Sequence, residues 1–133
     1  MNAKLTFSFA ASIIVLGFFA NIAKADDLSG GDLDAMHSTY KANQARFARD
    51  YIGRKFSATI PFYSITESAF YRGTYQVGFG PADSFLSEVD CSISDRSVID
   101  KITDWNKGDQ ITLSGTVKDH VMGAVVLDKC TFP

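Results

Sequence analysis

Few side chains in this chain could carry out chemistry: two histidines, two cysteines and 15 acidic residues among 133. A hydrolase needs a nucleophile, a base and a group that orients the base. His37 and His120 are the candidate bases, but neither comes with a Gly-x-Ser-x-Gly or comparable nucleophile motif. The sequence therefore predicts a protein that is not an enzyme and has no catalytic residues. Catalysis by His120 stays open as an alternative.

Metal and cofactor binding receive little support from the residue types. Four aspartates cluster between residues 26 and 34, but their spacing is not that of a calcium loop. The cysteines, Cys91 and Cys130, have no nearby histidine and no third sulfur, which makes them a poor zinc site. We expect no metal and no cofactor.

The first 25 residues have the layout of a secretory signal peptide. Lys4 precedes an almost wholly apolar run at residues 5–20, and Ala23-Lys24-Ala25 places small residues where a signal peptidase reads them. The alternative is a membrane anchor, but the run of about 16 residues is shorter than the ~20 that span a bilayer. The junction has no cysteine, which disfavours a lipid-anchored form. We expect cleavage after Ala25 and a periplasmic or secreted protein with no transmembrane span.

Export changes how the cysteines and the charge are interpreted. Two cysteines in a small exported domain predict one disulfide, Cys91–Cys130, with free thiols or a metal pair as alternatives. The closed loop of about 40 residues corresponds to ~4 kcal/mol in a chain-entropy estimate. Cleavage would leave 11 basic and 15 acidic residues, a net charge of −4 with histidine neutral. That balance disfavours a polyanionic partner.

Hydrophobic periodicity predicts the secondary structure of the mature part. Residues 26–32 form a polar leader expected to be flexible, with Asp32 placed to cap the helix that follows. Apolar residues at helical spacing then predict one helix that ends at Gly53, and a second, short helix is expected at residues 97–105. Alternation with a period of two predicts five strands, at residues 56–62, 75–79, 89–93, 111–117 and 124–132.

One helix followed by three strands, a short helix and two strands is the order of an OB-fold. We therefore predict one mainly β domain at residues 33–133. It is a five-stranded Greek-key barrel with an N-terminal helix and a short helix between strands three and four. The third and fifth strands are neighbours in that topology, which brings Cys91 close to Cys130. Because Cys130 shares its strand face with Asp128, we expect a bulge or strand end there.

Several segments have the pattern of a known family. They are Tyr40-Lys41-Ala42-Asn43, Gly53-Arg54-Lys55, Asp90-Cys91-Ser92-Ile93, Lys107-Gly108-Asp109, Leu113-Ser114-Gly115-Thr116-Val117 and Val125-Val126-Leu127-Asp128-Lys129-Cys130. On these residues the chain resembles the exported bacterial OB-fold proteins called "tRNA_anti-like", over most of its mature length. The resemblance implies the fold and the compartment. It carries no catalytic residues, and Ile60-Pro61-Phe62 departs from the glycine usual in the first strand.

OB-folds commonly bind ligands across strands two and three, with the first-to-second and fourth-to-fifth loops closing over the ligand. In this chain those loops are expected to hold Phe70, Tyr71 and Arg72 on one side and Lys118 and His120 on the other. The aromatic residues could stack bases, sugars or peptide side chains. Alternatively, Phe70 and Tyr71 close the end of the barrel as part of its core.

Acidic side chains beside that surface argue against nucleic acid. Glu88 and Asp90 would meet a phosphate backbone with like charge, and the second strand offers no basic groove. We therefore predict a non-enzymatic binding or interaction module of the bacterial cell envelope, whose partner is a protein or a small ligand. The alternative is an oligonucleotide-binding OB domain outside the cytoplasm. The sequence leaves the oligomeric state open.

Overall fold

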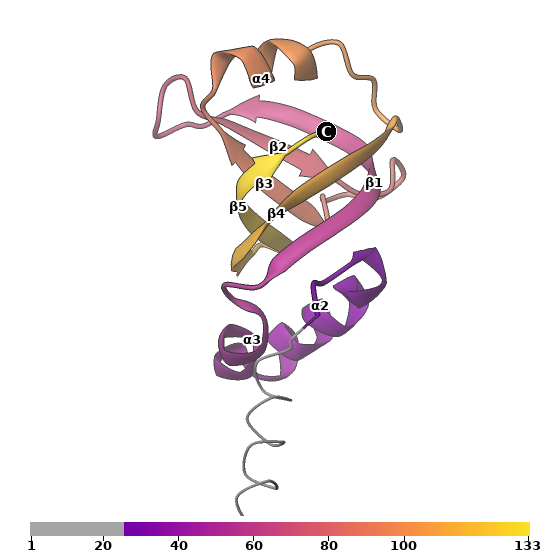
Figure 1. The fold of residues 1–133 in the computed structure, drawn as a ribbon, viewed down its shortest axis with the longest axis vertical. Coiled ribbons are helices and arrows are strands. Elements are labelled where there is room, and N and C mark those ends of the chain that lie inside the picture. Colours follow the sequence, from indigo (N-terminus) through magenta and orange to yellow (C-terminus); the bar gives the residue numbers. More distant parts are fainter. Residues whose placement is uncertain (1–25) are drawn as a thin grey trace, which may run out of the picture.

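The computed structural model describes residues 26–133, so the predicted signal peptide lies outside the described residues. A five-stranded barrel forms the body of the molecule, with two N-terminal helices below it and a short helix above (Figure 1). In chain order the elements are η1 (Gly30–Asp32), α2 (Leu33–Ala42), α3 (Gln44–Tyr51), β1 (Lys55–Glu67), β2 (Tyr75–Phe79), β3 (Val89–Ile93), α4 (Arg96–Ile102), β4 (Gln110–Val121) and β5 (Ala124–Thr131).

The barrel closes because β1 is long enough to pair on two sides. Its first half, from Lys55 to Pro61, pairs with β4, and its second half, from Phe62 to Glu67, pairs with β2. A register shift between Phe62 and Ser64 marks the bend, as expected of a bulge in a strongly curved strand. The closed order is β1-β2-β3-β5-β4, with β3 and β5 parallel. This confirms the predicted fold class.

Buried side chains form one core that continues into the helices at both ends. Below the barrel, Met36 of α2 is fully buried and Phe47 of α3 is 1% exposed. Above it, Ile102 of α4 is buried and the Trp105 ring packs edge-on against Phe62. Each fully buried large apolar side chain contributes roughly 1.5–3 kcal/mol relative to exposure. The N-terminal helices are therefore part of the domain.

The N-terminal helix differs from the single helix that the periodicity predicts. Asn43 has extended backbone angles (φ −165°, ψ 103°) and separates α2 from α3. Its side-chain oxygen accepts a hydrogen bond from the Arg46 backbone N–H at 2.9 Å and so caps α3. An asparagine that bonds the backbone locally competes with helix continuation. We call α2 and α3 together the helical hairpin.

The segment expected to be a flexible leader is attached to the barrel in the structure. Leu28 is 4% exposed, its N–H donates to the Lys55 carbonyl at 2.8 Å, and its carbonyl accepts from the Ser57 N–H at 2.9 Å. Asp32 makes no side-chain cap on α2 and instead accepts from the Ser29 N–H at 2.8 Å. The buried Leu28 side chain attaches this otherwise polar segment to the barrel, which its overall composition did not indicate.

Two strands extend into segments that the sequence assigns to loops. β1 continues to Glu67, beyond the predicted strand end at residue 62, so the β1–β2 loop begins later than expected. β4 continues to Val121, and only Met122 and Gly123 separate it from β5, both with positive φ. His120 therefore lies in a strand and not in a loop. Continued pairing with the neighbouring strand outweighs the polar composition of both segments.

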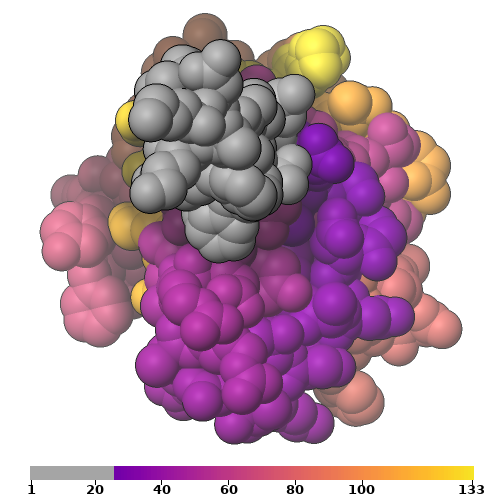
Figure 2. All heavy atoms as spheres, turned by 60° about the horizontal axis from the view of Figure 1, so that its bottom comes forward, coloured from indigo at the N-terminus to yellow at the C-terminus, as the bar shows by residue number. Residues whose placement is uncertain are grey.

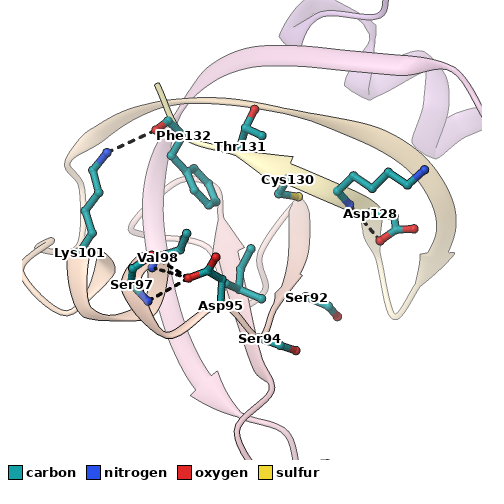
Figure 3. Close-up of a pocket in the computed structure, with 12 residues that line it drawn as sticks. Ser92, Ser94, Asp95, Ser97, Val98, Lys101, Asp128, Cys130, Thr131 and Phe132 are labelled. Atoms are coloured by element: carbon teal, nitrogen blue, oxygen red, sulfur yellow. Dashed lines mark hydrogen bonds between the residues drawn. The ribbon is translucent and has the colours of Figure 1, made fainter.

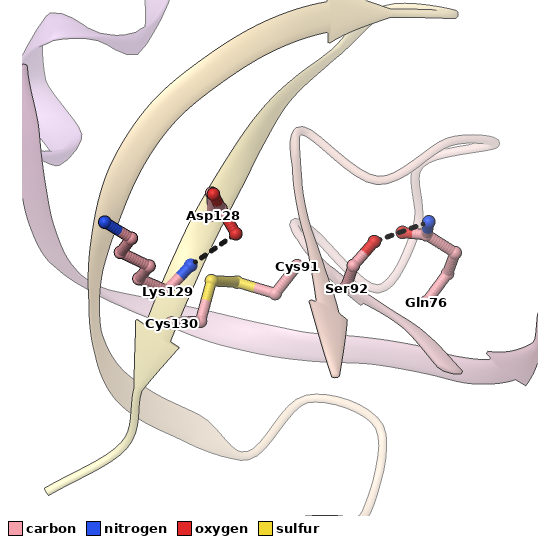
Figure 4. The surroundings of a disulfide bond; sticks show 6 residues. All are labelled: Gln76, Cys91, Ser92, Asp128, Lys129 and Cys130. Carbon is pink, nitrogen blue, oxygen red and sulfur yellow. Dashed lines mark hydrogen bonds between the residues drawn. A yellow bond between two sulfur atoms is a disulfide. The ribbon is translucent and has the colours of Figure 1, made fainter. Parts of the chain in front are cut away.

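The disulfide joins β3 to β5, as predicted, with Cα atoms 6.2 Å apart (Figure 4). The predicted bulge is also present, because the register passes from Thr116↔Asp128 to Ser114↔Thr131. Lys129 takes a positive φ of 53° inside it. Opposite the bulge stands Gly115, where a Cβ would lie 3.2 Å from the Cys130 sulfur. Glycine allows β4 to approach this close.

Among the described residues, none of the helices has the length and apolar character that crossing a membrane requires.

Candidate functional site

The structure separates the two loops that were predicted to flank a ligand. The β1–β2 loop follows Glu67 and leads into Tyr75, which pairs with Ile93 at the end of β3. The β4–β5 turn precedes Val125, which pairs with Val89 at the start of β3. The two loops therefore lie toward opposite ends of β3 and do not form one site.

The predicted site residues differ in exposure. Phe70 is 90% exposed and Tyr71 is 71% exposed, so neither closes the barrel as part of its core. Arg72 and Lys118 are also exposed, whereas His120 is only 6% exposed. The first three residues form an exposed aromatic and basic loop tip. His120 belongs to the contact between the barrel and the helical hairpin.

A cleft of about 590 Å³ opens on another side of the barrel, between β3, α4 and β5 (Figure 3). None of the five predicted ligand-binding residues lines it. Its walls come from the end of β3 and the start of α4 on one side and from the end of β5 on the other. The lining residues are Ser92, Ile93, Ser94, Asp95, Ser97, Val98, Lys101, Asp128, Lys129, Cys130, Thr131 and Phe132.

The cleft exists because β3 and β5 pair over only part of their length. Their last paired residues are Cys91 and Leu127. Beyond that point β5 continues through its bulge to Thr131, paired with β4 alone. Side chains of α4, among them Val98 and Lys101, line the space between the two strands (Figure 3), and the disulfide holds the strands together where the cleft begins (Figure 4). The opening is thus built into the barrel and fixed by a covalent bond.

The charges that line the cleft balance. Asp95 caps α4 by accepting from the Ser97 hydroxyl at 2.7 Å and its N–H at 2.9 Å. These bonds, led by the Ser97 side chain, lower the pKa of Asp95. Lys101 donates from Nζ to the Phe132 carbonyl at 3.3 Å, and Asp128 accepts from the Lys129 N–H at 2.9 Å. Two cations and two anions favour a polar ligand without strong net charge.

Hydroxyl groups and apolar side chains complete the surface of the cleft. Ser92 accepts from the Gln76 amide at 2.9 Å, and Ser94 exchanges a hydrogen bond with the Thr74 hydroxyl at 3.0 Å. Thr131 is exposed at the rim, and Phe132 is half-buried among the aromatic rings of the core. A hydroxyl-rich rim beside apolar side chains fits a ligand with a polar backbone and an apolar side, such as an extended peptide segment.

Sequence reasoning missed this cleft because no single motif marks it. The only signal is the run of small hydroxyl residues Ser92, Ser94 and Ser97, which continues across the end of a short strand. Its importance depends on where the pairing of β3 with β5 stops, and periodicity does not give that. The loop positions typical of the fold pointed to residues outside this cleft.

The outer face of β2 and β3 gives little support to nucleic-acid binding. Neither strand contains lysine or arginine. Asp90 accepts from the Ser87 hydroxyl at 2.5 Å, and burial raises the pKa of its carboxyl, against the lowering effect of that hydrogen bond. Neutralising phosphates requires cationic side chains, so this face offers a phosphate backbone no favourable partner.

A second cleft, of about 510 Å³, lies at the contact between α2 and the β4–β5 turn. Asp34, Lys41 and the two histidines are among the residues that line it. In the described part of the chain, no group of three or more histidine, cysteine or acidic side chains is arranged to hold a metal ion.

Comparison with known proteins shows the fold and little more. No family model matches the chain, and no curated protein matches it. A crystal structure of a "putative nucleic acid-binding lipoprotein" from Klebsiella pneumoniae is similar, with a TM-score of 0.57 and 14% identity. The match covers 86% of this chain and 96% of that one. At this identity the likeness supports the barrel fold, and the tRNA_anti-like family remains a resemblance.

Proposed function

We propose that this protein is a non-enzymatic binding module of the bacterial cell envelope that holds a polar segment of another envelope protein in the β3–α4–β5 cleft. The observation that carries the proposal is the cleft itself. It has ligand-sized volume, balanced charges and a hydroxyl rim, and a disulfide fixes its walls. A small polar ligand with an apolar side would meet the same chemistry.

The envelope location rests on two independent features. Residues 1–25 have the layout of a signal peptide. The Cys91–Cys130 disulfide would persist in an oxidising compartment and would be reduced in most bacterial cytoplasms. Both features support export, and both agree with the resemblance to exported OB-fold proteins.

A second candidate function is binding of single-stranded nucleic acid at the β1–β2 loop. The exposed rings of Phe70 and Tyr71 beside Arg72 favour it, because bases stack on aromatic side chains. The Klebsiella protein with a similar fold is called nucleic acid-binding. Against it stand the predicted mature charge of −4 and the lack of lysine and arginine in the neighbouring strands β2 and β3.

Photo-crosslinking in intact cells tests both candidates. A photoreactive phenylalanine analogue replaces Thr131 at the rim of the cleft, Phe70 at the β1–β2 loop, or Thr112 as the control. Thr112 is also exposed but lies on β4, where its hydroxyl forms a hydrogen bond with that of Thr59 at 2.9 Å, and it lines neither of the two clefts described above. The full chain is expressed with its own leader, and crosslinked material is separated with and without nuclease and identified by mass spectrometry.

The proposal predicts a discrete product from position 131 that survives nuclease and is absent from position 112. A nuclease-sensitive product from position 70 that weakens as salt rises would instead establish the nucleic-acid function. Equal products from positions 131 and 112, or none from position 131, would refute the cleft as the binding site.

A further inference from the structure

The two histidines of the chain, 83 positions apart, meet between the helical hairpin and the barrel. His37 on α2 and His120 on β4 lie with Nδ1 and Nε2, respectively, 2.8 Å apart. The Tyr40 ring stacks on His120 with centroids 4.0 Å apart, and Phe47 of α3 meets it edge-on at 5.5 Å. A polar contact thus sits inside an aromatic cluster where the helices join the barrel.

The number of protons on this pair decides whether the hydrogen bond can form. When both rings are neutral, one nitrogen donates and the other accepts. One added proton leaves that bond in place. A second proton places an N–H on both facing nitrogens, so that two donors and two positive charges oppose each other at hydrogen-bond distance. The hydrogen bond can therefore form when both rings are neutral or when one ring is protonated, but not when both rings are protonated.

We propose that the His37–His120 pair is a pH-sensitive latch that holds the helical hairpin on the barrel at neutral pH and releases it in acid. This inference is independent of the ligand in the β3–α4–β5 cleft. It concerns a different contact, on the other side of the molecule's core.

The surroundings give the second proton little stabilisation. In residues 26–133, His37 Nε2 and His120 Nδ1 are buried without a hydrogen-bond partner. The charged or titratable groups facing the pair are Asp34, Tyr40 and Lys41 from α2 and Asp119 from β4. The other neighbours are uncharged: the Phe47 ring from α3 and Gly123 from the β4–β5 turn. Asp119 already accepts from the His120 backbone N–H at 2.8 Å.

The pKa of His120 agrees with this geometry. Burial, and then the charge of His37, lower it below the usual 6.5, and Asp119 offsets part of the effect. A histidine whose folded pKa lies below its unfolded value binds fewer protons in the folded state. Its stabilising contribution is complete above about pH 6.5 and is lost as the pH falls through the folded value. Acid therefore favours opening of the contact.

The chain connections allow the helical hairpin to leave without unfolding the barrel. Leu28, before the hairpin, bonds to Lys55 and Ser57, which follow it, so both ends of the segment are fixed at the start of β1. Gly53 has a positive φ of 89° and donates to the Val117 carbonyl at 2.8 Å, which anchors the returning chain on β4. Figure 2 shows the helices spread across the lower end of the molecule. Release would uncover Met36 and Phe47.

Hydrogen exchange measured by mass spectrometry tests the latch. The protein purified after expression of the full chain is compared at pH 7.5 and pH 5, with rates corrected for the intrinsic effect of pH. The variants are His37→Gln and His120→Phe, which remove one titrating ring each; His120→Phe keeps an aromatic ring against Tyr40. Asp90→Asn is the matched control, since it removes a titrating group from the barrel and leaves both histidines.

The latch predicts that opening of α2 and α3 increases in acid, by up to about tenfold for each pH unit between about pH 6.5 and the folded pKa of His120, with no further rise below that pKa, while the strands stay protected. Asp90→Asn should keep this response, and the histidine variants should lose it. If His120→Phe does not fold, His37→Gln still decides. Equal corrected protection of the hairpin at both pH values, or an unchanged response in His37→Gln, would overturn the proposal.

Discussion

Two long-range links hold the molecule together, and they respond to different conditions. The Cys91–Cys130 disulfide joins two strands of the barrel across 39 positions, and the His37–His120 hydrogen bond joins the helical hairpin to the barrel across 83. The first is covalent, so between pH 5 and 7.5 it does not depend on protonation. The second can be broken by protons and is insensitive to reductant. The barrel and its helical attachment are thus stabilised by chemically separate means.

The protein surrounding the disulfide also differs from that surrounding the histidine pair. Around the disulfide the backbone is adapted to the bond, with a bulge at Lys129 and a glycine at position 115 that leaves room for the Cys130 sulfur. Around the histidines the packing is aromatic, and a ring nitrogen on each imidazole is left unsatisfied. A buried polar group without a partner costs about 1–3 kcal/mol. The disulfide site is therefore the more rigid of the two, and the histidine site is closer to opening.

Removing the disulfide should produce the largest loss of stability. In the double variant Cys91→Ala with Cys130→Ala, the unfolded chain regains the freedom of a loop of about 40 residues, and the free energy of unfolding should fall by about 4 kcal/mol. Urea titration measures the loss. The same loss should appear at pH 7.5 and pH 5, because no titrating group is removed.

Reductant provides the control for this prediction. The wild-type protein should approach the stability of the double variant when reduced, and the double variant should not respond. A loss that changes strongly with pH would contradict the separation of the two links.

Truncation of a buried side chain in the helical hairpin should have the next largest effect. Met36 is fully buried on α2, and Met36→Ala should lower the free energy that holds the hairpin closed by about 3 kcal/mol, through lost transfer energy and a cavity. Hydrogen exchange at pH 7.5 should show faster opening of α2 and α3 with little change in the strands. Gln44→Ala, at an exposed position on α3 of the same hairpin, is the control and should change little. Equal effects on hairpin and strands would mean that the two regions open together.

The fold was predictable because its signals are local or pairwise. Alternation gave all five strands, the element order gave the barrel topology, and that topology placed Cys91 beside Cys130. The parity conflict at Cys130 correctly predicted the bulge. The break at Asn43 was missed because its apolar neighbours continue the helical period on both sides, and only the local bond to Arg46 interrupts it.

The candidate sites were less predictable because they depend on where pairing stops. His120 was assigned to a loop, yet pairing with β5 carries β4 through it and brings its ring to His37. The cleft depends on the end of the β3–β5 ladder at Cys91 and Leu127. Neither feature has a motif, because each results from three or more segments meeting in space.

The smallest expected effect concerns Asp90, where acid should act on stability in the opposite direction to its effect on the histidine link. Burial raises the pKa of the Asp90 carboxyl above 3.8, against the hydrogen bond from Ser87. An acid with a raised folded pKa stabilises the folded state fully below its unfolded value, and this contribution is lost as the pH rises through the folded value. Acid should therefore slightly stabilise the barrel at Asp90 while it weakens the histidine link of the hairpin. Asp90→Asn should flatten the acid-side slope of unfolding between pH 4 and 6, measured by urea titration, and raise stability slightly at neutral pH. If the change in unfolding free energy with pH were the same in this variant as in the wild type, the barrel's pH response would have to arise at another carboxyl.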